Sequence, residues 1–284
     1  MKWEGREESK NVIDSRRGGK ATKVGAGLGL GTLIIIGLAL FMGQDPSALL
    51  QQAQSQQVPQ TQQAPPTQAD DQLASFVKVV LKDCEDVWNV LFRKQLGMNY
   101  KEPILEIYSG KVNSACGMGT AASGPFYCPG DDKVYIDLSF YQELKNRFQA
   151  PGDFAMAYVV AHEVAHHVQN LLGITMEIQK QRGKIPEKDY NNLQVRLELQ
   201  ADFLAGVWAH HAQNMKGILE QGDIEEAMNA AHAIGDDRIQ MQSRGYVVPD
   251  SFTHGTSEQR MRWFRKGLES GDLRLGDTFD AVNL

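Results

Sequence analysis

The chain has 284 residues, of which 42% are hydrophobic and 23% are charged, as is typical of a globular domain with accessory segments. Its formal net charge of −6 gives no indication of a nucleic-acid partner, because such proteins usually present a basic surface. Three cysteines exclude a disulfide-rich scaffold but allow one bridge and one free thiol.

A stretch without charges near the N-terminus predicts a transmembrane helix. Residues 24–42 read VGAGLGLGTLIIIGLALFM, and a helix rising about 1.5 Å per residue over this length spans the ~30 Å core of a bilayer. Residues 1–23 are rich in Lys and Arg, so the positive-inside rule places this tail in the cytoplasm. We therefore expect a single-pass protein of the inner or plasma membrane, anchored by residues 24–43. Its C-terminal domain would be extracytoplasmic, and periplasmic where an outer membrane exists.

Two other interpretations of residues 24–43 are a cleaved signal peptide and a buried core helix. No small-x-small cleavage site follows Leu40, which disfavours the first. The Gln-, Pro- and Ala-rich tract 44–71 disfavours the second and predicts a flexible linker before a folded domain at 72–284. Small residues along the apolar stretch would let two such helices pack closely as a homodimer. These residues are Gly25, Gly27, Gly29 and Gly31.

The remaining sequence predicts several helices and a small sheet. Apolar residues recur at three- and four-residue steps from about residue 72 to a stop at Gly97, which indicates a first helix. Two short apolar runs come next, and such runs are typical of strands. A loop rich in Gly, Ser and Pro separates these two runs. The expected strands are 103–108 and 133–138, and the further helices are 153–171, 187–213, 223–243 and 256–269. This order predicts an α+β fold, mainly helical, rather than alternating βαβ units.

The expected helix 153–171 contains the pattern H-E-x-x-H as His162, Glu163 and His166. Two histidines four residues apart on a helix share one face, so both imidazoles can bind one metal ion. Glu163 lies beside them, where it can hold and deprotonate a water at the metal. Nitrogen and oxygen ligands with one open position favour Zn²⁺.

The third protein ligand is expected on the next long helix. A metzincin would place Gly and His at positions 169 and 172, which hold Gln169 and Leu172 here, so that class is excluded. Glu198 and Asp202 lie four residues apart among apolar neighbours, as in the E-x-x-x-D pattern of gluzincins. We expect Glu198 to bind zinc and Asp202 to accept the outer N–H of a ligand histidine. The alternative is an ordinary pair of solvent-facing charges.

These motifs and several longer segments resemble the bacterial neutral zinc metallopeptidases. The carrying segments are MKWEGREESKNVIDSRR, SACGMGTAASGPFYCPGDDKVYIDLSF, VVAHEVAHHVQNLLG, RLELQADFLAGVWA and SFTHGTSEQRMRWF. The resemblance covers nearly the whole chain except the linker. It implies a zincin-like metallopeptidase domain of the gluzincin type behind a single membrane span, with undefined substrates.

More distantly, the metal-binding parts look like the prenyl proteases that act on C-terminal CAAX motifs. That group has a His and an Arg after the third ligand, which correspond to His254 and Arg260 here. The resemblance implies that His254 stabilises the oxyanion and that Arg260 orients it or the substrate. Gly255 stands where that group has Pro, and a helix-start residue with a surface Arg is the alternative.

Cys116 and Cys128 flank the glycine-rich loop and are expected to pair in an oxidising compartment. Cys84 falls on the apolar face of the first helix and is expected in the core. In related proteases the strand that corresponds to 133–138 pairs with an extended substrate. A purely structural strand is the alternative.

Together, these features predict a membrane-anchored zinc endopeptidase that cleaves extracytoplasmic proteins or peptides. Glu163, His254 and Arg260 would act in catalysis, and His162, His166 and Glu198 would bind Zn²⁺. Two other functions remain open, a non-catalytic adaptor stabilised by zinc and a zinc amidase that acts on cell-wall peptide.

Overall fold

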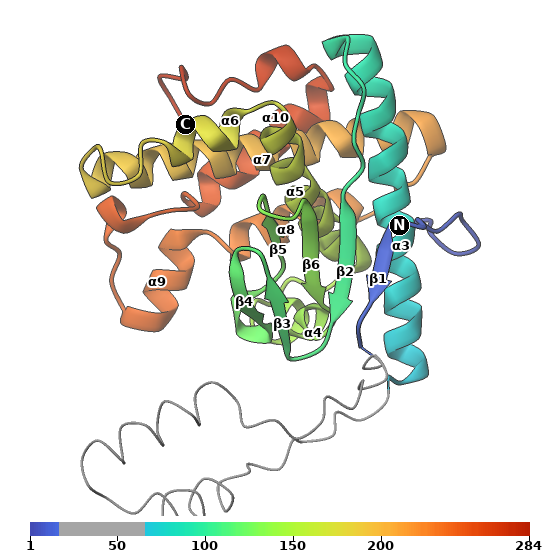
Figure 1. Ribbon diagram of the computed structural model, residues 1–284. Coiled ribbons are helices and arrows are strands. Elements are labelled where there is room, and N and C mark those ends of the chain that lie inside the picture. Colours follow the sequence, from blue (N-terminus) through green and yellow to red (C-terminus); the bar gives the residue numbers. More distant parts are fainter. Residues whose placement is uncertain (17–65) are drawn as a thin grey trace, which may run out of the picture. The chain divides into compact units, whose positions relative to one another are not determined.

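The computed structural model describes residues 1–16 and 66–284, which together form one compact unit. Figure 1 shows a small sheet and a hairpin beside helix α3 and the helices of the C-terminal half. The strands are β1 Val12–Asp14, β2 Ile104–Tyr108, β3 Lys111–Ser114, β4 Gly117–Thr120, β5 Phe126–Cys128 and β6 Lys133–Asp137. The α-helices are α3 Gln68–Leu91, α4 Phe140–Asn146, α5 Asp153–Leu171, α6 Ile174–Gln179, α7 Glu187–Lys216, α8 Asp223–Ala233, α9 Asp236–Arg244 and α10 Ser257–Ser270.

The main sheet has the strand order β1-β2-β6-β5. β1 and β6 run parallel to β2, whereas β5 runs antiparallel to β6 and forms one edge of the sheet. β3 and β4 form a separate antiparallel hairpin. The predicted strands 103–108 and 133–138 are present as β2 and β6. The others were not predicted, because β1 and β5 have only three residues each and the hairpin lies in the glycine-rich loop.

Helix α5 is buried along almost its whole length, because α3, α7, α8 and the sheet all pack against it. Phe154, Tyr158 and Val160 are inaccessible to solvent, and other apolar residues surround the helix on several sides. A helix that is apolar nearly all round is typical of a domain interior. The core therefore holds the polar H-E-x-x-H residues of α5 in a fixed position.

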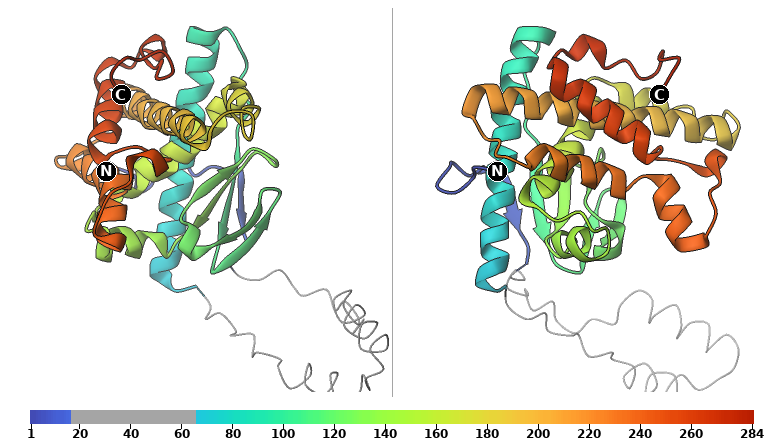
Figure 2. Two further views of the ribbon diagram at one scale, coloured as in Figure 1. Left: turned by 90° about the vertical axis from the view of Figure 1, so that its left-hand side faces the viewer. Right: turned by 180° about the vertical axis from the view of Figure 1, so that it is seen from behind.

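Helices α7 and α10 pack closely against each other, as Figure 2 shows from behind. A Cβ added at Gly206 of α7 would lie 2.1 Å from the Phe264 carbonyl oxygen, and one at Gly267 of α10 would lie 2.0 Å from the Phe203 carbonyl oxygen. Only glycine allows the two backbones to approach this closely. This contact joins the C-terminal half of α10 to the middle of α7.

Residues 1–16 belong to the same compact unit as the C-terminal domain, which corrects the predicted topology. β1 pairs with β2, Trp3 stacks edge-on against Phe76 of α3, and Arg16 bonds the Asp70 carbonyl oxygen. Arg6 and Arg16 therefore bind acidic and carbonyl groups of the domain instead of forming a free tail. The predicted placement of this segment and the domain on opposite sides of a membrane is wrong.

None of the helices formed by residues 1–16 and 66–284 is both long enough and apolar enough to cross a membrane. The predicted fold class is therefore wrong in its transmembrane helix. The mainly helical domain with a small sheet is present. The proposed anchor, residues 24–43, and its glycine-based dimer contact lie outside the described residues.

Candidate functional site

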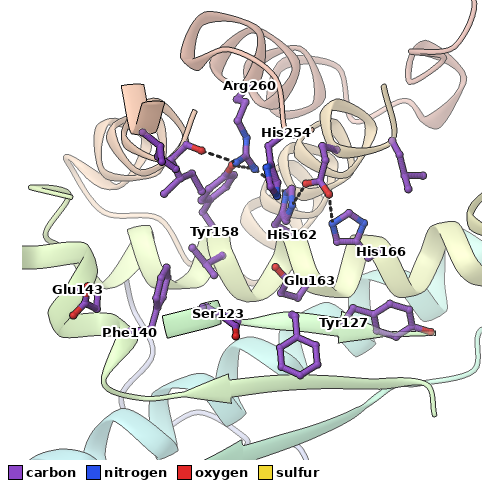
Figure 3. Close-up of a pocket in the computed structure, with 18 of the residues that line it drawn as sticks. Ser123, Tyr127, Phe140, Glu143, Tyr158, His162, Glu163, His166, His254 and Arg260 are labelled. Carbon is purple, nitrogen blue, oxygen red and sulfur yellow. Dashed lines mark hydrogen bonds and ion pairs between the residues drawn. The ribbon is translucent and has the colours of Figure 1, made fainter. Parts of the chain in front are cut away.

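The structure brings His162, His166 and Glu198 together between α5 and α7. The Nε2 atom of His162 lies 3.1 Å from one Glu198 carboxylate oxygen, and Nε2 of His166 lies 3.5 Å from the other. One ligand atom from each of the three residues falls within 4.8 Å of the others. Figure 3 shows the His162 and His166 imidazoles close together above the same helix. The four-residue spacing of the histidines produces this convergence, because it places both on the face of α5 that meets α7.

Asp202 binds the outer nitrogen of His162, at 2.9 Å from Nδ1. The same carboxylate accepts two hydrogen bonds from the Arg260 guanidinium, at 2.8 and 2.9 Å, and one from the Tyr158 hydroxyl at 2.5 Å. Burial by itself would raise the pKa of Asp202, but Arg260 and His162 outweigh it and hold the pKa at about 2. An ionised Asp202 keeps the proton of His162 on Nδ1 and leaves Nε2 free to bind a metal.

Arg260 is buried, so it is not the surface residue of the alternative interpretation. Its guanidinium is almost fully buried and points at Asp202 and Tyr158 from the second turn of α10. The close packing of α7 and α10 brings these groups together. Arg260 also lines the cleft, but its hydrogen bonds go to groups that hold His162. Through Asp202, these contacts fix the position of His162.

The outer nitrogen of His166 is held by Gln169, which the sequence analysis had used only to exclude the metzincins. Oε1 of Gln169 lies 2.9 Å from Nδ1 of His166. Its amide nitrogen donates to the Leu197 carbonyl oxygen at 2.7 Å and to Oε1 of Gln200 at 3.1 Å. Because that nitrogen is the donor, Oε1 must accept, and the proton of His166 lies on Nδ1. The three-residue spacing from His166 to Gln169 on a helix was the available signal.

Glu163 lies beside the two histidines and lines the cleft. Burial raises the pKa of its carboxyl group, although His166 and His162 oppose the shift. A carboxylate with a raised pKa is better matched to proton transfer near neutral pH than an ordinary one. His167 follows the motif but faces elsewhere, with Nε2 2.6 Å from the Lys101 carbonyl oxygen and Nδ1 3.1 Å from the Tyr127 hydroxyl.

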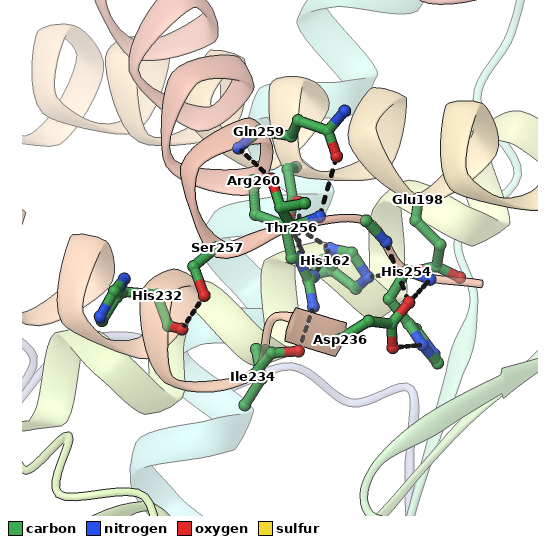
Figure 4. A network of polar contacts seen from close by, with 12 residues as sticks. His162, Glu198, His232, Ile234, Asp236, His254, Thr256, Ser257, Gln259 and Arg260 are labelled. Carbon is green, nitrogen blue, oxygen red and sulfur yellow. Dashed lines mark hydrogen bonds and ion pairs between the residues drawn. The ribbon is translucent and has the colours of Figure 1, made fainter. Parts of the chain in front are cut away.

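His254 also lines the cleft and is held by Asp236, a residue that the sequence analysis did not single out. Figure 4 shows the Asp236 carboxylate beneath the loop before α10. It accepts from the backbone N–H groups of Thr253 at 2.7 Å and His254 at 2.6 Å, and it lies 3.2 Å from Nδ1 of His254. Burial lowers the pKa of His254, but Asp236 and Glu198 outweigh it and raise the pKa above its usual value. Asp236 could not be inferred from the sequence, because the contact depends on the approach of α9 to this loop.

The cleft around these residues has a volume of about 750 Å³. Phe126 and Tyr127 of β5 line it, and β5 ends the sheet, so no strand within residues 1–16 and 66–284 pairs with its outer edge. The strand expected to pair with substrate, 133–138, is instead an inner strand between β2 and β5. It therefore has no free edge. Cys116 and Cys128 form the predicted disulfide, which ties the end of β5 to the hairpin.

Comparison with known proteins gives a family and several relatives. The family model described as "Putative neutral zinc metallopeptidase" matches residues 1–279. The uncharacterized protein YpfJ of Escherichia coli K12 is 47% identical over 287 residues, which cover 98% of this chain and 99% of the relative. The uncharacterized protein Rv2575 of Mycobacterium tuberculosis H37Rv is 43% identical over 201 residues, 67% of each chain. No solved structure matches the chain. The chain therefore belongs to the "Putative neutral zinc metallopeptidase" family.

Proposed function

We propose that the protein is a zinc-dependent endopeptidase that hydrolyses peptide bonds in proteins or peptides. The observation that carries this proposal is the convergence of two imidazole Nε2 atoms and one carboxylate beside Glu163 in an open cleft. A buried metal site without an opening would fit a purely structural role. Here the acid–base residue and the candidate ligands face the same space.

The donor set suits zinc. His162, His166 and Glu198 offer two nitrogens and one oxygen, a combination found in catalytic zinc sites that keep a fourth position open. Asp202 and Gln169 occupy the outer nitrogens and leave both Nε2 lone pairs directed at the same point. Zinc held there supplies a Lewis acid that acidifies water and polarises a carbonyl group.

The chain's own residues supply the proton transfers and the charge stabilisation. Glu163 takes a proton from the attacking water and delivers it to the nitrogen of the leaving amine. His254, whose pKa is raised chiefly by Asp236 and also by Glu198, donates to the oxyanion that forms on the substrate carbonyl. Arg260 acts through Asp202 by fixing the orientation of His162.

The free edge of β5 supports a peptide as the substrate. An extended peptide can add to an exposed strand by main-chain hydrogen bonds, and β5 lines the cleft that contains Glu163. Such binding depends little on the side chains of the peptide, because the hydrogen bonds to its backbone position the scissile bond. The polypeptide backbone is therefore favoured over small amides.

The test is cleavage of a mixed peptide pool by the full chain loaded with zinc, followed by mass spectrometry. Glu163→Gln should abolish cleavage while zinc remains bound, because the variant keeps the three ligands and removes the proton acceptor. The matched control is Glu269→Gln, the same change at an exposed position outside the cleft lining, which should retain activity. A chelator should stop cleavage, and added zinc should restore it.

Other results would favour the alternative functions. Equal cleavage by Glu163→Gln and the unaltered protein would contradict the mechanism. Bound zinc with no cleavage of any substrate would favour a zinc-stabilised adaptor. Cleavage of cell-wall peptide fragments, but of no protein-derived peptide, would favour an amidase.

A further inference from the structure

The cleft differs in chemistry on the two sides of Glu163. Beyond the C-terminal end of α5, its lining includes Thr175, Gln179 and Gln194, which are polar. Toward the N-terminal half of α5, its lining includes Val159, Phe140 and Phe148, which are apolar. Figure 3 shows Phe140 on the side of Glu163 opposite to His166. The reacting bond would therefore lie between a polar region and an apolar one.

Val159 links the apolar region to the site of reaction. It precedes Glu163 by four residues on α5, so the two side chains are neighbours on one face of the helix. Val159 is 5% exposed and lines the cleft. A substrate side chain adjacent to the scissile bond would meet Val159 first on this side.

Phe140 and Phe148 extend the apolar surface from α4 and the residues after it. Their ring centroids are 6.3 Å apart, and both rings are half-buried, so each keeps an accessible face. Arg147 lies over the Phe148 ring at 5.0 Å and pairs with Glu143 at 3.5 Å. Because these two charges offset each other, this end of the cleft offers no net charge that would favour a charged substrate side chain.

The wall that faces Phe140 carries little side-chain volume. Gly124 has a φ of +70°, a conformation that favours glycine. A Cβ added at this position would lie 3.5 Å from the Phe140 ring, which is van der Waals contact. Ala121 and Ser123 are the other small residues of this stretch that line the cleft. Gly124 thus lies against one side of the Phe140 ring, and the small residues next to it add little side-chain volume to this part of the cleft.

We infer that the cleft selects peptides with a large apolar side chain next to the scissile bond, in a subsite formed by Val159, Phe140 and Phe148. This inference rests on the proposed peptidase function and adds the substrate class. The subsite has a rigid floor on α5, aromatic rings on one wall and balanced charges at its rim. A Leu or Phe side chain would be removed from water there, whereas Ala would leave the rings exposed.

The experiment uses the zinc-loaded full chain and paired peptides that differ only at the residues flanking the cleavage site. The preferred cuts should fall next to Leu, Met, Phe or Tyr, with kcat/KM at least about tenfold above the Ala-containing peptide. Phe140→Ala and Phe148→Ala should each reduce this ratio severalfold. Tyr246→Ala, which removes an exposed aromatic ring outside the cleft lining, should leave the ratio unchanged.

The ratio is measured on two peptides with one preparation, so any loss of folded enzyme cancels. Cleavage that depends on Glu163 but shows no preference for apolar residues would overturn this inference and leave the peptidase intact. A preference unchanged by both Phe140→Ala and Phe148→Ala would overturn the assignment of the subsite. No cleavage of any peptide would overturn the proposed function, and this inference with it.

Discussion

At the scale of single residues, the two histidines of the candidate metal site are supported in different ways. His162 is backed by an ionised carboxylate, Asp202, which Arg260 holds in place. His166 is backed by a neutral amide, Gln169, which is fully buried. A carboxylate partner makes an imidazole a stronger donor than an amide does, so the two ligands should contribute unequally to metal binding.

Gln169→Leu should weaken zinc binding by about 10–100-fold, because the near-isosteric side chain no longer orients His166. The measurement is zinc affinity by competition with a chromogenic chelator. The matched control is Gln194→Leu, the same change one helical turn before Glu198 on α7, which should shift affinity little. The loss should exceed any general loss of folding, which the melting temperature of the metal-free variants would reveal. Unchanged affinity in Gln169→Leu would rule out the role of this amide.

At the scale of elements, regular patterns could be predicted and short or tertiary features could not. The H-E-x-x-H spacing in α5 and the E-x-x-x-D spacing in α7 are helical periodicities, and both helices are present where the sequence indicates them. β5 was missed because three residues are too few for an alternating pattern. Asp236 was missed because its contact with His254 depends on how α9 approaches the loop before α10, which local sequence does not show. Gln169 was missed although its three-residue spacing from His166 on one helix carried the signal.

The edge strand β5 depends on the disulfide for its position. It pairs with β6 through only three residues, and Cys128 at its end is linked to Cys116 beside the hairpin. Tyr127 gives a further attachment, since its hydroxyl lies 3.1 Å from Nδ1 of His167 on α5. Loss of the disulfide should therefore loosen the strand that supports the substrate more than it disturbs the metal ligands.

Replacing Cys116 and Cys128 together by Ser should lower the free energy of unfolding by roughly 3 kcal/mol in the chain-entropy model for a loop of this length. It should also raise KM more than it lowers kcat, because in the proposed mechanism β5 would bind the peptide and Glu163 on α5 would transfer the proton. Urea unfolding and steady-state kinetics provide the measurements. Reductant should reproduce the effect in the unaltered protein and change nothing in the double variant. Identical stability in both proteins would show that the bridge is dispensable.

At the scale of the whole molecule, residues 1–16 complete the domain from the opposite edge of the sheet. β1 pairs with one edge of β2, and β6 pairs with the other. Arg6 pairs with the buried carboxylate of Asp83, which also accepts from Lys216 of α7 at 2.9 Å. The segment therefore connects the sheet, α3 and α7, and the domain cannot be delimited at residue 72 as the sequence suggested.

A fragment of residues 66–284 should consequently melt several degrees below the full chain. Removing residues 1–16 exposes one edge of β2, uncovers the Phe76 ring that Trp3 covers and removes one partner of Asp83. A loss of about 2 kcal/mol would shift the melting temperature by roughly 4–8 °C in a domain of this size. The exposed edge should also make the fragment more prone to aggregation.

Two controls separate this effect from the removal of residues 17–65. A chain in which a Gly/Ser linker replaces 17–65 should keep the melting temperature, because it retains β1 and both arginines, Arg6 and Arg16. A synthetic peptide of residues 1–16 should raise the melting temperature of the 66–284 fragment with increasing concentration, as expected for a ligand that binds only the folded state. A scrambled peptide of the same composition should not. The prediction would be wrong if the fragment had the same melting temperature as the full chain and the peptide did not change it. Residues 1–16 would then not contribute to the stability of the domain.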